Sequence, residues 1–226
     1  MRRHFLWLGA LGVAFAILGT PSATALRIEF DDANDIADWE LGPNAVAEVA
    51  DGLLELTVAG PQDSGIFFGD VLWTDYTMEV HARKQEGTPY FHLFVRTQIP
   101  AQDFYFMEIS YNSDSTSVFQ FAGAVGVEIT GGARPARPAS KDTAGGDAYT
   151  IVFEAEGETL RTFIDGELMV ETTDATYPNG RPGLGGRDST VWYDYVEING
   201  PGIAPSPVEP AGKLAVVWGG LRQPSR

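Results

Sequence analysis

Six polar residues that could bind a ligand lie between positions 81 and 112, on three segments in which apolar and polar residues alternate. If these segments pair as neighbouring strands, their polar side chains share one face, opposite the residues that point into the core. We expect this face to form a shallow groove, although a solvated face with ordinary cross-strand Arg–Glu pairs is the alternative. The predicted ligand-binding residues are His81, Arg83, His92, Arg96, Glu108 and Asn112.

The chemistry of this set suits a sugar. Arginine, histidine and carboxylate side chains hydrogen-bond hydroxyl groups, and an aromatic ring can stack on the apolar face of a pyranose. Phe94, Phe106 or Tyr90 could supply that ring.

Catalysis has weaker support in the sequence. Glycoside hydrolysis commonly needs two carboxylates, about 5.5 Å apart for retention or about 6.5–9.5 Å apart for inversion. Glu108 is the one acid on its predicted strand, where Ser110 and Asn112 follow it. No Gly-x-Ser-x-Gly elbow and no zinc-type histidine spacing occurs. The sequence therefore favours a binding module and assigns no catalytic residue; in an enzyme, Glu108 would be the acid/base.

A structural calcium ion is the one cofactor that the sequence suggests, and none is required. Asp31 and Asp32 lie near the start of the body and Asp194 near its end, and terminal strands commonly pair. Carboxylate oxygens are the ligands that Ca²⁺ prefers. The alternative is that these aspartates cap helices or turns.

Composition and charge limit the partners. The chain has 226 residues, of which 44% are hydrophobic, and it contains no cysteine, which excludes disulfides and thiolate chemistry. Its formal net charge of −16 disfavours nucleic acid and anionic membrane surfaces. We therefore expect a globular protein that does not bind nucleic acid.

The first 25 residues are typical of a secretory signal. Arg2 and Arg3 precede an apolar run, Phe5 to Gly19, and Ala23 to Ala25 fits a small-residue cleavage site. The run is shorter than the ~20 residues of a membrane span. We expect an exported protein that is periplasmic, surface-bound or secreted, with no stable membrane insertion after cleavage.

The body, residues 26–200, has the period-two pattern of an all-β domain throughout. Asp51-Gly52 and Asp165-Gly166 mark hairpins, and Gly185-Gly186 is interpreted as a turn. Many short strands with such turns predict an antiparallel two-sheet jelly-roll sandwich. Residues 201–226 contain five prolines and form a predicted linker and tail.

Several stretches, taken together and in order, resemble the concanavalin-like, laminin-G-like jelly-roll superfamily, and in particular its bacterial 3-keto-disaccharide hydrolase branch. The stretches are Phe30-Asp31-Asp32, Asp75 to Val80, Phe91 to Arg96, Phe163 to Glu167, Gly180 to Gly185 and Trp192 to Ile198. The resemblance covers the body and implies the fold. It does not fix the function, because this superfamily includes lectins, adhesion modules and glycosidases.

We therefore expect an exported, non-catalytic carbohydrate-binding or adhesion-type module. The alternatives are a hydrolase acting on glycosides or 3-keto-disaccharides through Glu108, and a protein-interaction module of the cell envelope that uses the proline-rich tail.

Overall fold

The computed structural model describes residues 25–85, 88–98, 103–123, 125–130 and 148–205. The predicted signal, residues 1–24, and most of the predicted tail, residues 206–226, lie outside this part of the chain. In the described part, no helix is long and apolar enough to span a membrane. The helical content there is one short 3-10 helix, η1 (Ala33–Ile36).

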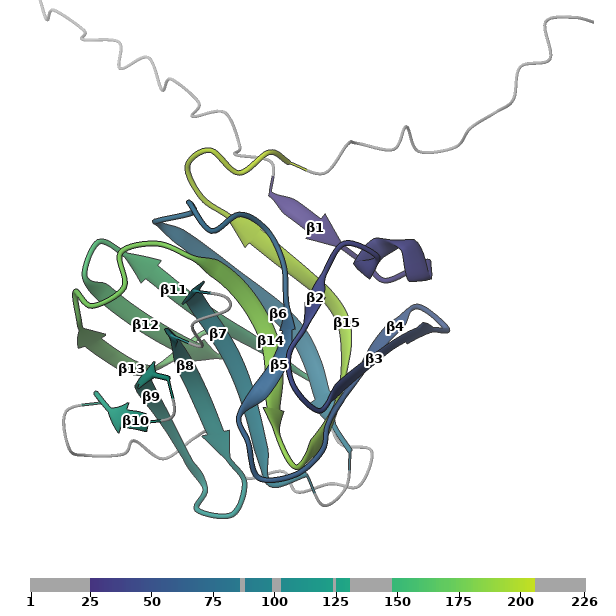
Figure 1. The fold of residues 1–226 in the computed structure, drawn as a ribbon, viewed down its shortest axis with the longest axis horizontal. Coiled ribbons are helices and arrows are strands. Elements are labelled where there is room, and N and C mark those ends of the chain that lie inside the picture. The colour runs from purple at the N-terminus through teal and green to yellow at the C-terminus, as the bar shows by residue number, and fades with distance from the viewer. Residues whose placement is uncertain (1–24, 86–87, 99–102, 124, 131–147, 206–226) are drawn as a thin grey trace, which may run out of the picture.

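Two antiparallel sheets form the sandwich that the alternation predicts (Figure 1). Sheet A, of eight strands, has the order β13 (Glu167–Thr173), β12 (Thr159–Ile164), β11 (Tyr149–Glu156), β6 (Tyr76–Lys84), β15 (Ser189–Asn199), β4 (Leu53–Val58) and β3 (Ala45–Ala50), with β1 (Leu26–Ile28) paired to β15. Sheet B, of seven strands, has the order β10 (Val125–Glu128), β9 (Ser115–Ala122), β8 (Asp103–Ser110), β7 (Tyr90–Gln98), β14 (Arg181–Arg187), β5 (Ser64–Phe67) and β2 (Glu40–Leu41).

The core lies between the sheets and consists of the alternate residues that the sequence assigns to it. On β6, Met78 and Val80 are fully buried, and on β7 and β8 the same holds for Leu93 and Met107. The hairpin turns are also confirmed: Asp51 and Gly52 both have positive φ, as do Asp165 and Gly166. Such turns have the twist that joins neighbouring antiparallel strands.

The connection between β6 and β7 differs from the sequence prediction. These strands follow one another in the chain, but β6 belongs to sheet A and β7 to sheet B. In contrast, β7, β8 and β9 form the expected meander, with His92 opposite Glu108 and Phe106 opposite Phe119. The predicted common face therefore exists on β7 and β8 but does not extend to β6.

Gly185 and Gly186 lie inside strand β14 and do not form the predicted turn. A Cβ atom on Gly185 would lie 2.1 Å from the carbonyl oxygen of Ser64 on β5 and 2.7 Å from the ring of Phe94 on β7. These glycines thus permit a close approach of neighbouring strands, which is a second common reason for glycine in a sheet.

Candidate functional site

The outer face of sheet B, which points away from sheet A, is divided into an aromatic part and a polar part. The aromatic part is a second apolar cluster formed by Phe67, Phe94, Phe104 and Phe106, with Phe119 and Phe121 packed against it. Two stacked pairs order these rings: Phe106 and Phe119 lie 4.9 Å apart, and Phe104 and Phe121 also lie 4.9 Å apart. Farther along the same strands, the next positions on this face are occupied by polar residues.

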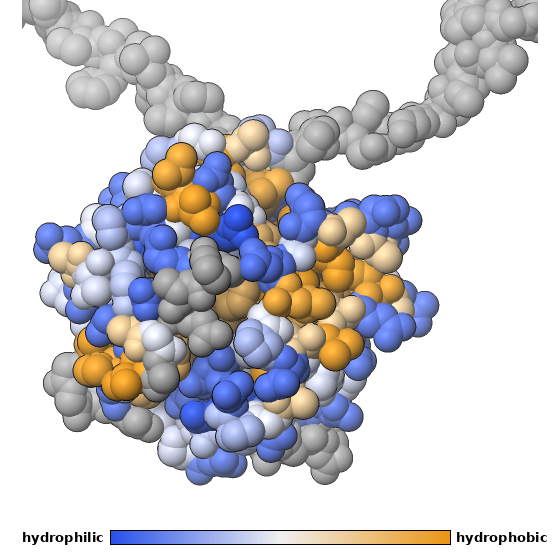
Figure 2. Space-filling model, in the orientation of Figure 1, coloured by the Kyte–Doolittle hydropathy of each residue, from blue (hydrophilic) through white to orange (hydrophobic). Residues whose placement is uncertain are grey.

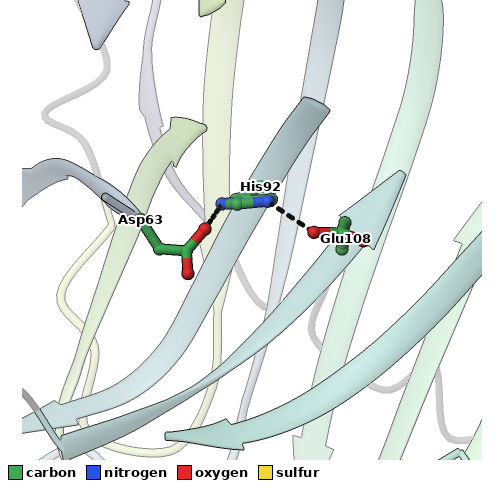
Figure 3. A group of neighbouring side chains, drawn as sticks. All are labelled: Asp63, His92 and Glu108. Atoms are coloured by element: carbon green, nitrogen blue, oxygen red, sulfur yellow. Dashed lines mark hydrogen bonds and ion pairs between the residues drawn. The ribbon is translucent and has the colours of Figure 1, made fainter. Parts of the chain in front are cut away.

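The polar part centres on His92, whose side chain is fully buried. Its two ring nitrogens face two carboxylates that come from different strands or loops (Figure 3). His92 Nε2 lies 3.3 Å from Glu108 Oε2, and His92 Nδ1 lies 3.6 Å from Asp63 Oδ1. Asp63 immediately precedes β5, and Glu108 lies on β8. The imidazole therefore lies between two carboxylates.

Arg187, at the end of β14, connects the same two carboxylates from the other side. Its Nη2 donates to Glu108 Oε2 at 3.2 Å, and its Nη1 lies 3.7 Å from Asp63 Oδ1. The guanidinium also lies 4.0 Å from the centre of the Tyr90 ring, a cation–π distance. Glu108 and Asp63 are 7% and 12% exposed, whereas Arg187 is 29% exposed. The two buried acids thus lie beside a partly exposed cation.

A cavity of about 540 Å³ opens beside this group. Its wall combines both parts of the sheet: Asp63, Tyr90, Phe106, Glu108, Ser110, Asn112, Ser113, Phe119, Phe121, Gly126 and Arg187. At one end, Ser113 Oγ donates to Ser110 Oγ at 2.8 Å and lies 2.7 Å from Ser115 Oγ. The cavity therefore offers aromatic faces, hydroxyl groups, carboxylates and a guanidinium within one ligand-sized space.

The face seen in Figure 2 is mostly hydrophilic; its largest apolar area lies at the right, on the side of strands β3 and β4, and smaller apolar patches lie at the top and at the lower left. Leu41 on β2 and Val46 on β3 are 49% and 65% exposed. This exposed apolar area is distinct from the phenylalanine cluster, because Phe94, Phe104 and Phe106 are each less than 5% exposed.

Three of the six predicted ligand-binding residues meet at the cavity. His92 supports its wall, and Glu108 and Asn112 line it. His81 and Arg83 do not reach it, since they lie on β6 of sheet A. There, His81 Nδ1 pairs with Asp194, and the Arg83 guanidinium lies 5.6 Å from the Trp192 ring centre. The predicted common face was wrong for these two residues because the chain crosses between sheets after β6.

Arg96 was also placed wrongly by the sequence, because it is buried. Its side chain is 1% exposed, and its φ of 54° lies in the left-handed region, at a break in the register of β7 with β8. The guanidinium donates to Thr74 O at 3.0 Å, to Tyr177 O at 3.2 Å and to Asp75 Oδ1 at 3.4 Å. This irregularity turns the side chain away from the alternation, so Arg96 joins loops at the end of the sandwich.

The backbone of Arg96 also has a buried partner. Its N–H donates to the hydroxyl oxygen of Tyr76 at 2.7 Å, and the Tyr76 hydroxyl donates to Gly180 O at 3.2 Å. Burial raises the pKa of Tyr76, against the opposing effects of the Arg96 backbone hydrogen bond and charge. The Tyr76 hydroxyl thus keeps its proton and serves as a structural link.

Asp63 and Arg187 are not among the site residues that the sequence predicts. Both reach the cavity through connections that cross between sheets, so neither lies near Glu108 in the sequence. Arg187 lies directly opposite Tyr90 in the β14–β7 pair. The available signal was the charge of Arg187 at the end of a glycine-rich segment, but the pairing of β14 with β7 is not visible in the sequence.

Metal binding has one structural candidate among the described residues, the trio Asp63, His92 and Glu108, whose nearest donor atoms lie within 4.8 Å of one another. The two carboxylates, however, face different nitrogens of one ring (Figure 3), and a metal ion bonds a single imidazole nitrogen along its lone pair. As placed, the two carboxylates therefore do not converge on the same nitrogen of His92, and only Glu108 is hydrogen-bonded to the ring.

The predicted calcium site remains a prediction. Asp32 caps η1 by accepting a hydrogen bond from the Asn34 N–H, and Asp35 accepts one from the Asp32 N–H, which completes a capping box. Asp194 is the partner of His81. Among the described residues, Asp31, Asp32 and Asp194 do not form a group of converging metal donors.

These features define a class: a concanavalin-like jelly-roll sandwich with a polar and aromatic cavity on the open face of one sheet. Within that class, residues 27–199 match the 3-keto-α-glucoside-1,2-lyase-like domain, and the chain belongs to this family. No curated protein matches the chain.

Solved structures with the same fold are similar to the chain at low identity. A carbohydrate-binding module, CBM66, from Bacillus subtilis has a TM-score of 0.58 and 22% identity, over 69% of this chain and 91% of that one. A β-1,3-1,4-glucanase (lichenase) from a mouse hindgut metagenome has a TM-score of 0.57 and 15% identity, over 78% and 99%. A β-glucanase from Bacillus licheniformis has a TM-score of 0.55 and 12% identity, over 79% and 99%. At such identities these likenesses show the fold.

Proposed function

We propose that this protein is exported and binds a saccharide in the cavity on the outer face of sheet B. The observation that carries the proposal is the juxtaposition of the Phe106–Phe119 stack with Glu108 and Arg187 in one cavity. A pyranose has an apolar face that stacks on aromatic rings and a rim of hydroxyls that needs donors and acceptors. The serine hydroxyls at the end of the cavity add further polar partners.

The solved structures with the same fold support this choice, because one is a carbohydrate-binding module and two are glucanases. The charge of the protein favours uncharged sugars: its net charge of −16 would repel polyanionic glycans at long range.

The test is retention on a panel of immobilised neutral polysaccharides, measured for the wild type and two cavity variants, Phe119→Ala and Glu108→Gln. We expect both variants to lose retention. Trp192→Ala is the matched control, because Trp192 is an aromatic residue on the outer face of sheet A, where its indole N–H donates to Glu55. Equal retention by the wild type and the cavity variants would contradict the proposed site.

A second candidate is an enzyme that acts on glycosides or 3-keto-glycosides, with Glu108 as acid/base. One structural observation favours it: Asp63 supplies the second carboxylate that the strand of Glu108 lacks, and an oxygen of each acid lies within 4.8 Å of the other. Acid–base catalysis of glycosidic-bond cleavage commonly needs two carboxyl groups. Membership of a lyase-like family supports it further.

The two candidates are separated by measuring product. The retention experiment is run together with an assay for released sugar, on glycosides and on their 3-keto derivatives. A binding module retains the ligand and releases nothing, whereas an enzyme releases product that disappears in Glu108→Gln.

A further inference from the structure

Strand β3 lies at one end of sheet A and is the least protected of the strands at the four ends of the two sheets (Figure 1). An edge strand exposes unpaired backbone N–H and C=O groups, which proteins usually protect by a short strand, charged residues or a bulge. The edge strands β2 and β10 have two and four residues, and β13 has two acids and a register shift with β12. In contrast, β3 has six residues, one charge and a regular register with β4.

Both faces of this edge are incompletely covered. On the inner face, three apolar side chains are only partly buried against the core: Ala45, Ala47 and Val49. On the outer face, Val46 is 65% exposed, and Glu48 lies directly opposite Glu55 of β4. Like charges in directly opposite positions of a sheet are destabilising.

No cation in the described part of the chain forms an ion pair with Glu48 or Glu55. Glu55 accepts a hydrogen bond from the indole N–H of Trp192 at 2.7 Å, which leaves its charge in place. The edge of β3 therefore lacks an apolar cover on its inner face and a cation on its outer face.

A segment beyond the described residues has the complementary composition. Residues 213–218 read Lys-Leu-Ala-Val-Val-Trp, and residues 210–226 contain three cations and no acid in a chain of formal net charge −16. In an extended strand, alternate side chains share a face. Leu214, Val216 and Trp218 would therefore form an apolar face, opposite the face of Lys213.

We propose that residues 213–218 add an antiparallel strand to the open edge of β3. Both segments have six residues, so they pair along their whole length. This register places the three large apolar side chains on the inner face, with Leu214 opposite Val49, Val216 opposite Ala47 and Trp218 opposite Ala45. The added strand thus covers the partly buried edge of the core.

The same register satisfies the outer face. Val217 lies opposite Val46 and covers its exposed side chain. Lys213 lies opposite Ala50 and diagonal to Glu48, a separation that long side chains can bridge. The lysine then supplies the cation that the two glutamates lack.

Strand direction and chain length agree with this pairing. Because β3 and β15 are both antiparallel to β4, they run in the same direction, and a chain that returns from Asn199 enters at the Ala50 end. Reaching the open side of β3 takes three strand spacings, about 14 Å, and about six residues along the sheet, about 20 Å. The eight steps from Pro205 to Lys213 span up to about 26 Å, enough for the resulting diagonal of about 24 Å.

A second copy of the chain suits this edge less well. Two paired β3 strands would bring further carboxylates to the Glu48–Glu55 pair, and each chain has a formal net charge of −16. The tail segment instead supplies a positive charge. The proposal is independent of the saccharide site, since β3 belongs to sheet A and the cavity lies on sheet B.

The experiment is disulfide trapping in the full-length protein, which contains no cysteine of its own. Under mild oxidation, Val46→Cys/Val217→Cys should close an intramolecular disulfide at least about tenfold faster than the matched control Val46→Cys/Val216→Cys. Opposite residues of an antiparallel pair have Cα atoms about 4.5–5.5 Å apart, which a disulfide can span, whereas the side chain at 216 points to the other face. Equal rates for the two pairs would overturn the proposal. A disulfide between two copies, seen as a doubled mass, would assign the edge to a second copy and overturn it as well.

Charge variants of the fast pair test the contact with Glu48. Lys213→Glu should slow closure about two- to fivefold, because it replaces an attractive diagonal pair with a third carboxylate. Arg222→Glu is the matched control, since it makes the same change of charge outside the paired segment and should leave the rate unchanged. Equal effects of the two substitutions would overturn the placement of Lys213 beside Glu48.

Discussion

Replacing Arg96 with methionine tests whether this buried cation is structural, as its hydrogen bonds indicate, or a ligand-binding residue, as its position in the sequence suggests. The guanidinium makes two hydrogen bonds to backbone carbonyls, at 3.0 and 3.2 Å, and a longer contact of 3.4 Å with Asp75. Methionine fills much of the volume of the arginine side chain, and the left-handed backbone conformation, with a φ of 54°, is as unfavourable for methionine as for arginine. The substitution therefore isolates the effect of the guanidinium.

The expected loss follows from these contacts. A hydrogen bond to a charged group contributes about 1.5–3 kcal/mol, and the carbonyls of Thr74 and Tyr177 would lose their donor. The variant no longer buries the guanidinium charge, and this gain offsets part of the loss in stability. The Asp75 carboxylate is 46% exposed and stays solvated, so the expected loss for Arg96→Met is that of the two carbonyl hydrogen bonds, about 2–4 kcal/mol. That is a large fraction of a typical domain's stability.

The assay is urea unfolding followed by tryptophan fluorescence and circular dichroism, with Arg161→Met as control. Arg161 has ion pairs with Glu154, Glu156 and Glu171 on the surface of sheet A, where solvent screens them, so we expect a much smaller effect. A loss below about 1 kcal/mol for Arg96→Met would refute this reasoning. If that variant also lost glycan retention, Arg96 would be a ligand-binding residue after all.

Three further outcomes are expected. Phe119→Ala should weaken saccharide retention about tenfold, about 1.4 kcal/mol, while the midpoint of urea unfolding changes little, because Phe119 is partly exposed at the cavity. Gly180→Ala should destabilise the fold by about 1–3 kcal/mol in the same unfolding assay, since a Cβ there would lie 2.3 Å from the carbonyl carbon of Arg96 and the φ is 147°. Burial, reinforced by the hydrogen bond to Asp174, raises the pKa of Tyr105 to about 12. Because tyrosine in the unfolded chain ionises near 10, the Tyr105 contribution is complete below that pH and is lost as the pH rises toward 12. Tyr105→Phe should flatten the dependence of unfolding free energy on pH in that window, and an unchanged slope would contradict the assignment.

The fold was accessible from the sequence because it rests on local regularities. The alternation on β6, β7 and β8 separates core from surface whichever strands lie beside them, and this separation is confirmed at Met78, Leu93 and Met107. The Asp-Gly turns act within four residues, so they too can be recognised without coordinates. The pairing of His92 with Glu108 follows in the same way from the β7–β8 hairpin.

The site depended on information that no local pattern contains. Whether β6 pairs with β7 or crosses to the other sheet depends on packing across the whole sandwich, and this choice removed His81 and Arg83 from the cavity. The register break at Arg96 turned a residue from the expected face into the interior. Each error arose where a contact between distant segments outweighed the period-two rule.

The amino-acid sequence alone thus determined the sandwich, its hairpins and the aromatic and acidic character of one strand pair, because side-chain alternation and turn conformation depend on neighbouring residues. Only the tertiary structure brought Asp63 and Arg187 to His92 and Glu108, since their strands meet through crossovers that link segments far apart in the chain. The buried charge group is a product of that long-range pairing.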